Sequence, residues 1–175
     1  LFTEGLNLPL QDVLDGVPAD SFNCPGAILK ADYAPDHPMA FGMPERDMIF
    51  FSGGRAYEMA HRDMETGEED GGQEAGIHGA GSAGENGGQN GHGPTGSELA
   101  PPALVDISVE PFAWYPREPL LLSGWMIGDE LIRGKAAAVD VSYGEGKVLI
   151  FGFNVHNRAQ ARSTMRMFFN GLLHR

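Results

Sequence analysis

Residues 136–153, AAAVDVSYGEGKVLIFGF, decide the fold because they contain two apolar runs on either side of a short turn. The runs are residues 136–141 and 147–153, and the turn-forming residues Ser142, Tyr143, Gly144, Glu145 and Gly146 join them. Two such runs around a glycine-containing turn are typical of a β-hairpin. The second run is continuously apolar, so we predict a strand that is buried on both faces.

An amphipathic helix is predicted after the hairpin, over residues 158–173. Its apolar residues recur at three- and four-residue steps, and they are Ala161, Met165, Phe168, Phe169 and Leu172. This spacing places them on one face of a helix. We therefore expect that stripe to pack the closing helix on the sheet.

The part of the chain before the hairpin is predicted to be rich in strands. Apolar runs predict strands at residues 27–33, 48–51, 104–109 and 120–125, and short helices are predicted at 10–14 and 56–61. Residues 63–100 are rich in Gly, Glu, Asn and Gln, so we predict a disordered acidic loop there. This stretch either separates two domains or interrupts one. We favour a single domain over 1–175, because residues 1–62 hold too few strong elements for a core of their own.

The charge pattern excludes some partners. The net charge is -12, and the predicted loop contributes eight acidic residues and no Lys or Arg, which leaves -4 for the rest of the chain. This balance disfavours nucleic acid and anionic membranes as partners. No apolar run approaches the roughly 18 residues that a membrane span needs.

Cys24 is the single cysteine, so an intrachain disulfide and a cysteine-rich zinc site are excluded. Cys24 precedes a predicted strand, whereas a nucleophile elbow follows one. We interpret it as a small apolar residue in a turn, and residual glutaminase or amidohydrolase chemistry at Cys24 is the weakest of our hypotheses. The six histidines are scattered without an HExxH spacing, and we predict no metal site and no catalytic residue in this chain.

Two segments are candidates for binding a small ligand. Gly53, Gly54 and Arg55 follow a predicted strand and precede a predicted short helix, which is the local order of an anion site, although a plain strand-to-helix turn is favoured. His156, Asn157 and Arg158 join the last strand to the closing helix, where they could line a crevice. Alternatively, Asn157 caps the helix and Arg158 faces solvent, which is the interpretation that we favour.

Four segments in order resemble one bacterial family. They are CPGAILK at 24–30, HPMAFGMP at 37–44, LLLSGWMIGDE at 120–130 and GKVLIFGF at 146–153, and Arg158, Gln160 and the FFN of residues 168–170 follow them. Together they resemble the C-terminal region of bacterial zinc carboxypeptidase-like proteins, in which a metallopeptidase domain precedes a domain similar to class I glutamine amidotransferases. The resemblance implies an α/β fold of the Rossmann-like or flavodoxin-like class, with a C-terminal β-hairpin and a closing helix.

The resemblance also implies a role. The zinc ligands and the catalytic glutamate of such a peptidase belong to the upstream domain, and the glutaminase nucleophile has no counterpart here. Because the chain begins at Leu1 without a lead-in, we expect a fragment whose N-terminal strands are absent. The leading hypothesis is a non-catalytic accessory module, whose partner is the upstream peptidase domain or the missing half of its own domain. The alternative is a domain that binds a peptide carboxylate or a sugar. The localisation is not predicted, although a bacterial parent of this kind would suit secretion or the periplasm.

Overall fold

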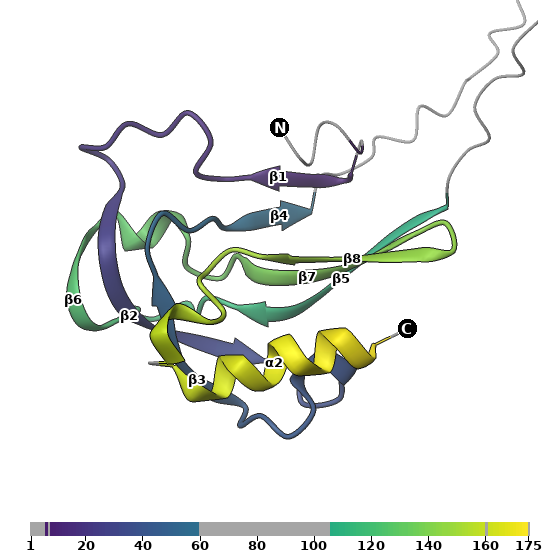
Figure 1. Cartoon of the computed structure of the whole chain (residues 1–175). Helices are drawn as coiled ribbons and strands as arrows, with labels where there is room; N and C mark the ends of the chain where they lie inside the picture. The colour runs from purple at the N-terminus through teal and green to yellow at the C-terminus, as the bar shows by residue number, and fades with distance from the viewer. Residues whose placement is uncertain (1–5, 7, 60–105, 160, 175) are drawn as a thin grey trace, which may run out of the picture. The chain divides into compact units, whose positions relative to one another are not determined.

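The first strand of the predicted hairpin lies inside the sheet in the computed structural model (Figure 1), which describes residues 6, 8–59, 106–159 and 161–174. Strand β7 (Ala136–Tyr143) turns at residues 144–145 into β8 (Gly146–Phe151), with Val139 opposite Ile150. On its other side β7 pairs with β5 (Ile107–Trp114). The hairpin is therefore confirmed.

The burial of the hairpin differs from the prediction. β7 is the buried strand, with its first six residues all buried, whereas β8 is partly exposed along most of its length. The reason is that β7 has neighbours on both sides, while β8 pairs with β7 alone among the described residues. A continuous apolar run thus does not make β8 a central strand.

A second group of strands forms around β2 (Asn23–Tyr33). It pairs with β3 (Arg46–Phe51) along one edge and with β6 (Leu121–Ile127) along the other, and its end reaches β5 through Asp32 and Trp114. In β2, burial alternates from Ala27 to Tyr33, as expected for a strand with one face on the core. The strands predicted at 27–33, 48–51 and 120–125 are confirmed.

Both short helices predicted near the N-terminus are wrong. Residues 10–12 form β1 (Leu10–Asp12), which pairs with β4 (Tyr57–Met59), and β4 pairs with β7 through Tyr57 and Ala136. Helices of five or six residues are unstable without strong packing, and pairing at a sheet edge satisfies the same backbone groups. His61 and the predicted loop at 63–100 lie outside the described residues.

The closing helix α2 (Arg162–Leu173) is confirmed, but it begins four residues later and buries another face than predicted. Thr164 and Met167 are its buried residues, and Gly171 packs against Leu149 and Met39. Two residues of the predicted stripe, Phe169 and Leu172, are 55% and 67% exposed. α2 packs closely against η1 (Pro38–Ala40). Because there is little space between them, small and slender side chains face inward and the large rings face outward.

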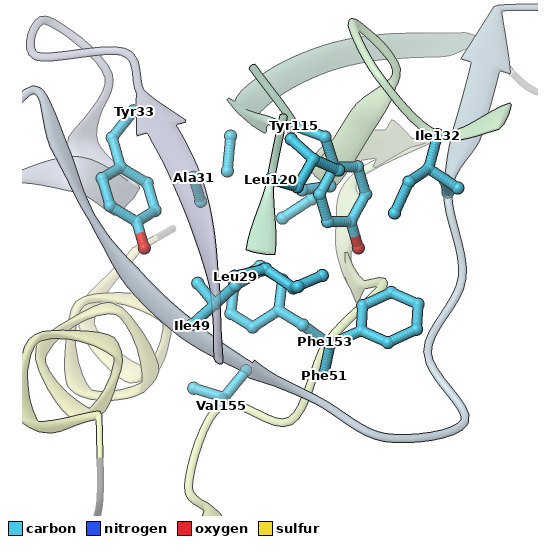
Figure 2. Packing of buried hydrophobic residues seen from close by; sticks show 14 of the residues in the cluster. Leu29, Ala31, Tyr33, Ile49, Phe51, Tyr115, Leu120, Ile132, Phe153 and Val155 are labelled. Carbon is cyan, nitrogen blue, oxygen red and sulfur yellow. The ribbon is translucent and has the colours of Figure 1, made fainter. Parts of the chain in front are cut away.

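The interior is filled by aromatic and aliphatic side chains from distant segments. Figure 2 shows Leu29, Ile49 and Phe51 of β2 and β3 around the same space as Tyr115 and Phe153. Tyr115, Phe51 and Phe112 are the largest fully buried side chains. The remaining short helices, η2 (Asp129–Leu131) and η3 (Asn157–Ala159), lie in connections between elements.

The fold is α/β, with an open antiparallel sheet of eight strands and a C-terminal helix within the described residues. The finer prediction of a Rossmann-like or flavodoxin-like fold is not confirmed. Folds of that class are built on parallel strands. Every ladder between the described strands is antiparallel.

Candidate functional site

The two ligand-binding candidates from the sequence meet at one hollow of about 460 Å³. Residues 52–55 and 151–156 line it, together with Phe168 of α2. We call this the Arg55 hollow. Gly53, Gly54 and Arg55 belong to it, and so does His156, although about a hundred residues separate the two segments.

Backbone hydrogen bonds hold the two walls of the Arg55 hollow together. The amide of Arg55 donates to the carbonyl oxygen of Gly152 at 2.7 Å, and the amide of Asn154 donates to that of Phe50 at 3.0 Å. From the core, the hydroxyl of buried Tyr115 donates to the Arg55 carbonyl oxygen at 2.8 Å. These bonds fix the two walls relative to each other and to the buried ring of Tyr115.

The charged group of the Arg55 hollow is the guanidinium of Arg55. Its Nε lies 3.3 Å from Oδ2 of Asp12, and the side chain is half exposed. Exposed His156 and the half-buried Asn154 add polar groups beside it. A guanidinium has five N–H donors, so beside its contact with Asp12 it can still bind the carboxylate or phosphate of a ligand. The helix expected after Arg55 is absent, because β4 follows it, so no helix N-terminus contributes to binding here.

Asn157 and Arg158 are placed differently from His156. Neither residue is among those that line the Arg55 hollow. Arg158 is exposed and has a left-handed backbone, with φ 49°. The predicted cap at Asn157 is wrong, since α2 begins at Arg162 with Ala161 as its N-cap residue, without a side-chain capping bond. Arg158 does face solvent, as the favoured interpretation expected.

Cys24 lies inside β2 and not in the turn before it. Its thiol is buried and contacts the carbonyl oxygen of Phe51 at 3.8 Å. Burial raises the pKa of Cys24, which disfavours the thiolate that nucleophilic chemistry requires. No histidine of the described chain forms a hydrogen bond with it.

A second polar group, which the sequence analysis missed, surrounds Asp140 in the middle of β7. Its members are His37, Glu110, Asp140, Lys147 and His174, and we call it the Asp140 cluster. Oδ2 of Asp140 lies 2.5 Å from Nε2 of His174, 3.1 Å from Nζ of Lys147 and 3.7 Å from Nε2 of His37. Its Oδ1 is buried and has no hydrogen-bond partner within the described residues. One signal was available: an aspartate between valines in a buried strand is rarely there without partners.

The described residues contain neither a metal-binding group nor a membrane-spanning helix. No group of three or more His, Cys, Asp or Glu side chains among them is arranged to hold a metal ion. None of their helices has the length and apolar character that crossing a bilayer requires. The described residues therefore offer no site that fits the zinc of the peptidase family that the sequence resembles.

Comparison with known proteins adds no assignment. No family model, curated protein or solved structure matches the chain.

Proposed function

We propose that this chain is a non-catalytic accessory module that packs against another domain of its parent protein. That domain would be a zinc metallocarboxypeptidase-like peptidase, as the sequence resemblance implies, or another part of the same amidotransferase-like domain. The observation that supports the proposal best is the exposed apolar surface of β6. A surface of this kind favours a packing partner over a freely solvated domain.

β6 exposes large apolar side chains near both of its ends. Leu122 and Trp125 are 53% and 50% exposed, and Leu121 and Ile127 are exposed to a similar extent. The strand LLSGWMI has no charged residue and no proline, which are the usual protections of a free strand edge. Within the described residues β6 pairs only with β2, so one of its edges is open for packing or pairing.

The outer face of α2 is a second apolar surface. Phe168, Phe169, Leu172 and Leu173 are exposed there, and Phe168 and Phe169 contact each other edge to face. Isolated exposed apolar residues are common on proteins, whereas neighbouring rings and leucines on one face are characteristic of interaction sites. Two such surfaces on one chain suit a module that a larger protein covers.

The finer fold class belongs to the same proposal. In it, the antiparallel sheet is one part of a Rossmann-like or flavodoxin-like, amidotransferase-like domain, and the parallel strands of that class come from other residues of the parent. The open edge of β6 is compatible with such an extension.

The test begins with the coding sequence upstream of Leu1, which should encode a peptidase domain. That domain is expressed separately, and its affinity for this chain is measured by calorimetry. We expect Trp125→Glu to weaken binding at least about 30-fold, because a buried aromatic anchor typically contributes 2 kcal/mol or more.

Met48→Glu is the matched control, since Met48 is an apolar residue of β3 that is 42% exposed, close to the 50% of Trp125 on β6. It should leave the affinity within about threefold of wild type. Equal binding by wild type and Trp125→Glu would contradict the role of β6. Chelator-sensitive carboxypeptidase turnover by this chain alone, with zinc added, would contradict the non-catalytic role.

The second candidate function is binding of a peptide carboxylate or a sugar in the Arg55 hollow. It is favoured by one observation, the meeting of Gly53, Gly54 and Arg55 with His156 around the same space. We expect a titration with N-acetyl-alanine, followed by NMR, to shift amides of residues 52–55 and 152–156. Arg55→Ala should weaken this binding about tenfold or more, because it removes a charge-assisted hydrogen bond.

Arg158→Gly is the control for charge, and glycine tolerates the left-handed backbone at that position. It removes a cation outside the hollow, so the affinity should stay within about twofold. If both variants weaken binding equally, the effect is long-range electrostatics and the hollow is not the site. Saturable binding of N-acetyl-alaninamide with the same affinity would show that the carboxylate is not what Arg55 recognises.

A further inference from the structure

The Asp140 cluster connects five separate parts of the fold. Glu110 is on β5, Asp140 on β7 and Lys147 on β8, while His37 precedes η1 and His174 follows α2. The His37 and Asp140 side chains are each only 4% exposed. Charged or titratable groups so deeply buried have large effects on stability when their protonation changes.

The hydrogen bond that Nδ1 of His37 accepts from the amide of Met39, at 3.1 Å, fixes the protonation state of that ring. An imidazole nitrogen that accepts a hydrogen bond carries no proton, so the ring is neutral with its hydrogen on Nε2. That nitrogen faces Asp140 at 3.7 Å and Glu110 at 3.8 Å. Protonation at Nδ1 would turn the acceptor into a donor and break the bond to Met39.

The bond to Met39 matters because η1 is the surface on which α2 rests. Nδ2 of Asn170 donates to the carbonyl oxygens of Met39 at 3.0 Å and Phe41 at 3.1 Å. Arg166 donates to the carbonyl oxygen of Gly42, and the fully buried Met39 side chain packs against Gly171. A shift of η1 would therefore disturb several contacts of the helix at once.

The end of α2 is tied to the same cluster. Nε2 of His174 lies 2.5 Å from the carboxylate oxygen Oδ2 of Asp140 and 3.0 Å from Nζ of Lys147. Lys147 donates to the same carboxylate oxygen at 3.1 Å. The His37 ring stacks on Phe112 at a centroid distance of 5.2 Å and stands edge-on to His174 at 5.9 Å.

We propose that His37, Asp140 and His174 form a proton-sensitive latch, in which the neutral His37 ring keeps η1 in place under α2 and its protonation releases η1 together with the C-terminal half of the helix. The latch is a regulatory device in the fold, and it does not depend on the partner proposed above.

The direction of the pH effect follows from the surroundings of His37. Burial lowers its pKa, and this outweighs the attraction of Glu110 and Asp140, while His174 and Lys147 lower the pKa further. Because the pKa of an unfolded histidine is about 6.5, the released state binds the proton more readily than the latched state. The latch is therefore fully closed above about pH 6.5, and it weakens as the pH falls from there through the lowered pKa of His37.

Amide hydrogen exchange, expressed as protection factors, tests the latch in the full chain. Between about pH 7.5 and pH 5 we expect the amides of Ala40, Phe41 and residues 168–173 to lose about tenfold or more of their protection, relative to amides of β7. His37→Asn should remove this dependence, to within about twofold, because an asparagine oxygen accepts a bond from the amide two residues on and does not titrate.

His37→Phe is the opposite variant, since it preserves the stacking on Phe112 and removes the acceptor. It should show low protection of η1 and α2 at both pH values, with β7 unchanged. A pH-dependent loss that persists in His37→Asn would overturn the proposal, and so would a wild-type helix whose protection does not change. Loss of the dependence in His174→Gln but not in His37→Asn would assign the titration to His174 and likewise overturn the role of His37.

Discussion

Replacing Tyr115 with alanine is expected to lower the free energy of unfolding by about 4 kcal/mol, as for other large aromatic residues truncated in a core. Tyr115 is fully buried and stands edge-on to Phe51 at a centroid distance of 6.0 Å. Its hydroxyl donates to the carbonyl oxygen of Arg55 and lies 3.3 Å from that of Gly152. The variant therefore leaves a cavity and also removes the donor of the partly buried hydrogen bond to the carbonyl oxygen of Arg55. The measurement is chemical denaturation followed by circular dichroism.

Tyr115→Phe separates the two contributions. It preserves the ring and removes only the hydroxyl, so the expected loss is about 1–2 kcal/mol. Burial raises the pKa of Tyr115 well above its ordinary value, so the hydroxyl remains a donor at neutral pH. A loss below about 1 kcal/mol for Tyr115→Ala would mean that the ring does not support the core as described. A loss for Tyr115→Phe equal to that for Tyr115→Ala would place the whole effect on the hydroxyl.

The elements that the sequence predicted correctly are those determined by local pattern. β2, β3, β6 and the β7–β8 hairpin follow from apolar runs bounded by Gly, Pro and polar turn residues. The burial of these elements depends on their neighbours and was predicted less well. The run VLIFGF is typical of a central strand, yet β8 has one neighbour among the described residues. The outward face of α2 likewise depends on the close approach of η1, which no helical periodicity contains.

Some residues of the Arg55 hollow could be predicted from the sequence, but their meeting at one site could not. The sequence predicted four of its residues from local patterns, namely Gly53, Gly54, Arg55 and His156. The first three were predicted because a helix was expected after Arg55, and that helix does not form. They meet because Phe50 and Asn154 form an isolated bridge between β3 and the segment after β8. A contact across about a hundred residues has no local pattern. For the Asp140 cluster a local signal did exist, the charge inside β7, whereas its partners on four other segments could not be identified from it.

Gly152→Ala is expected to destabilise the protein by about 3 kcal/mol, through overpacking and the loss of a hydrogen bond. A Cβ at this position would lie 2.9 Å from the carbonyl carbon of Arg55 and 3.0 Å from the carbonyl oxygen of Ala137. Both are backbone atoms and cannot rotate away. The amide of Gly152 donates to that same oxygen of Ala137 at 2.7 Å, and its carbonyl oxygen accepts from Arg55. Relief of the clash must therefore separate the walls of the Arg55 hollow or move β7.

The matched control for Gly152→Ala is Gly146→Ala, where the nearest atom to an added Cβ is the carbonyl oxygen of Tyr143 at 3.6 Å, an ordinary contact. Its free energy of unfolding should stay within about 1 kcal/mol of wild type. Denaturation of both variants checks the prediction, and equal stability of the two would contradict the close approach at Gly152. If Gly152→Ala remains folded, the chemical shifts of residues 52–55 should move more than those of β6. This outcome follows because Gly152 joins the two walls directly, so strain placed there reaches Arg55 before it reaches the open edge of the sheet.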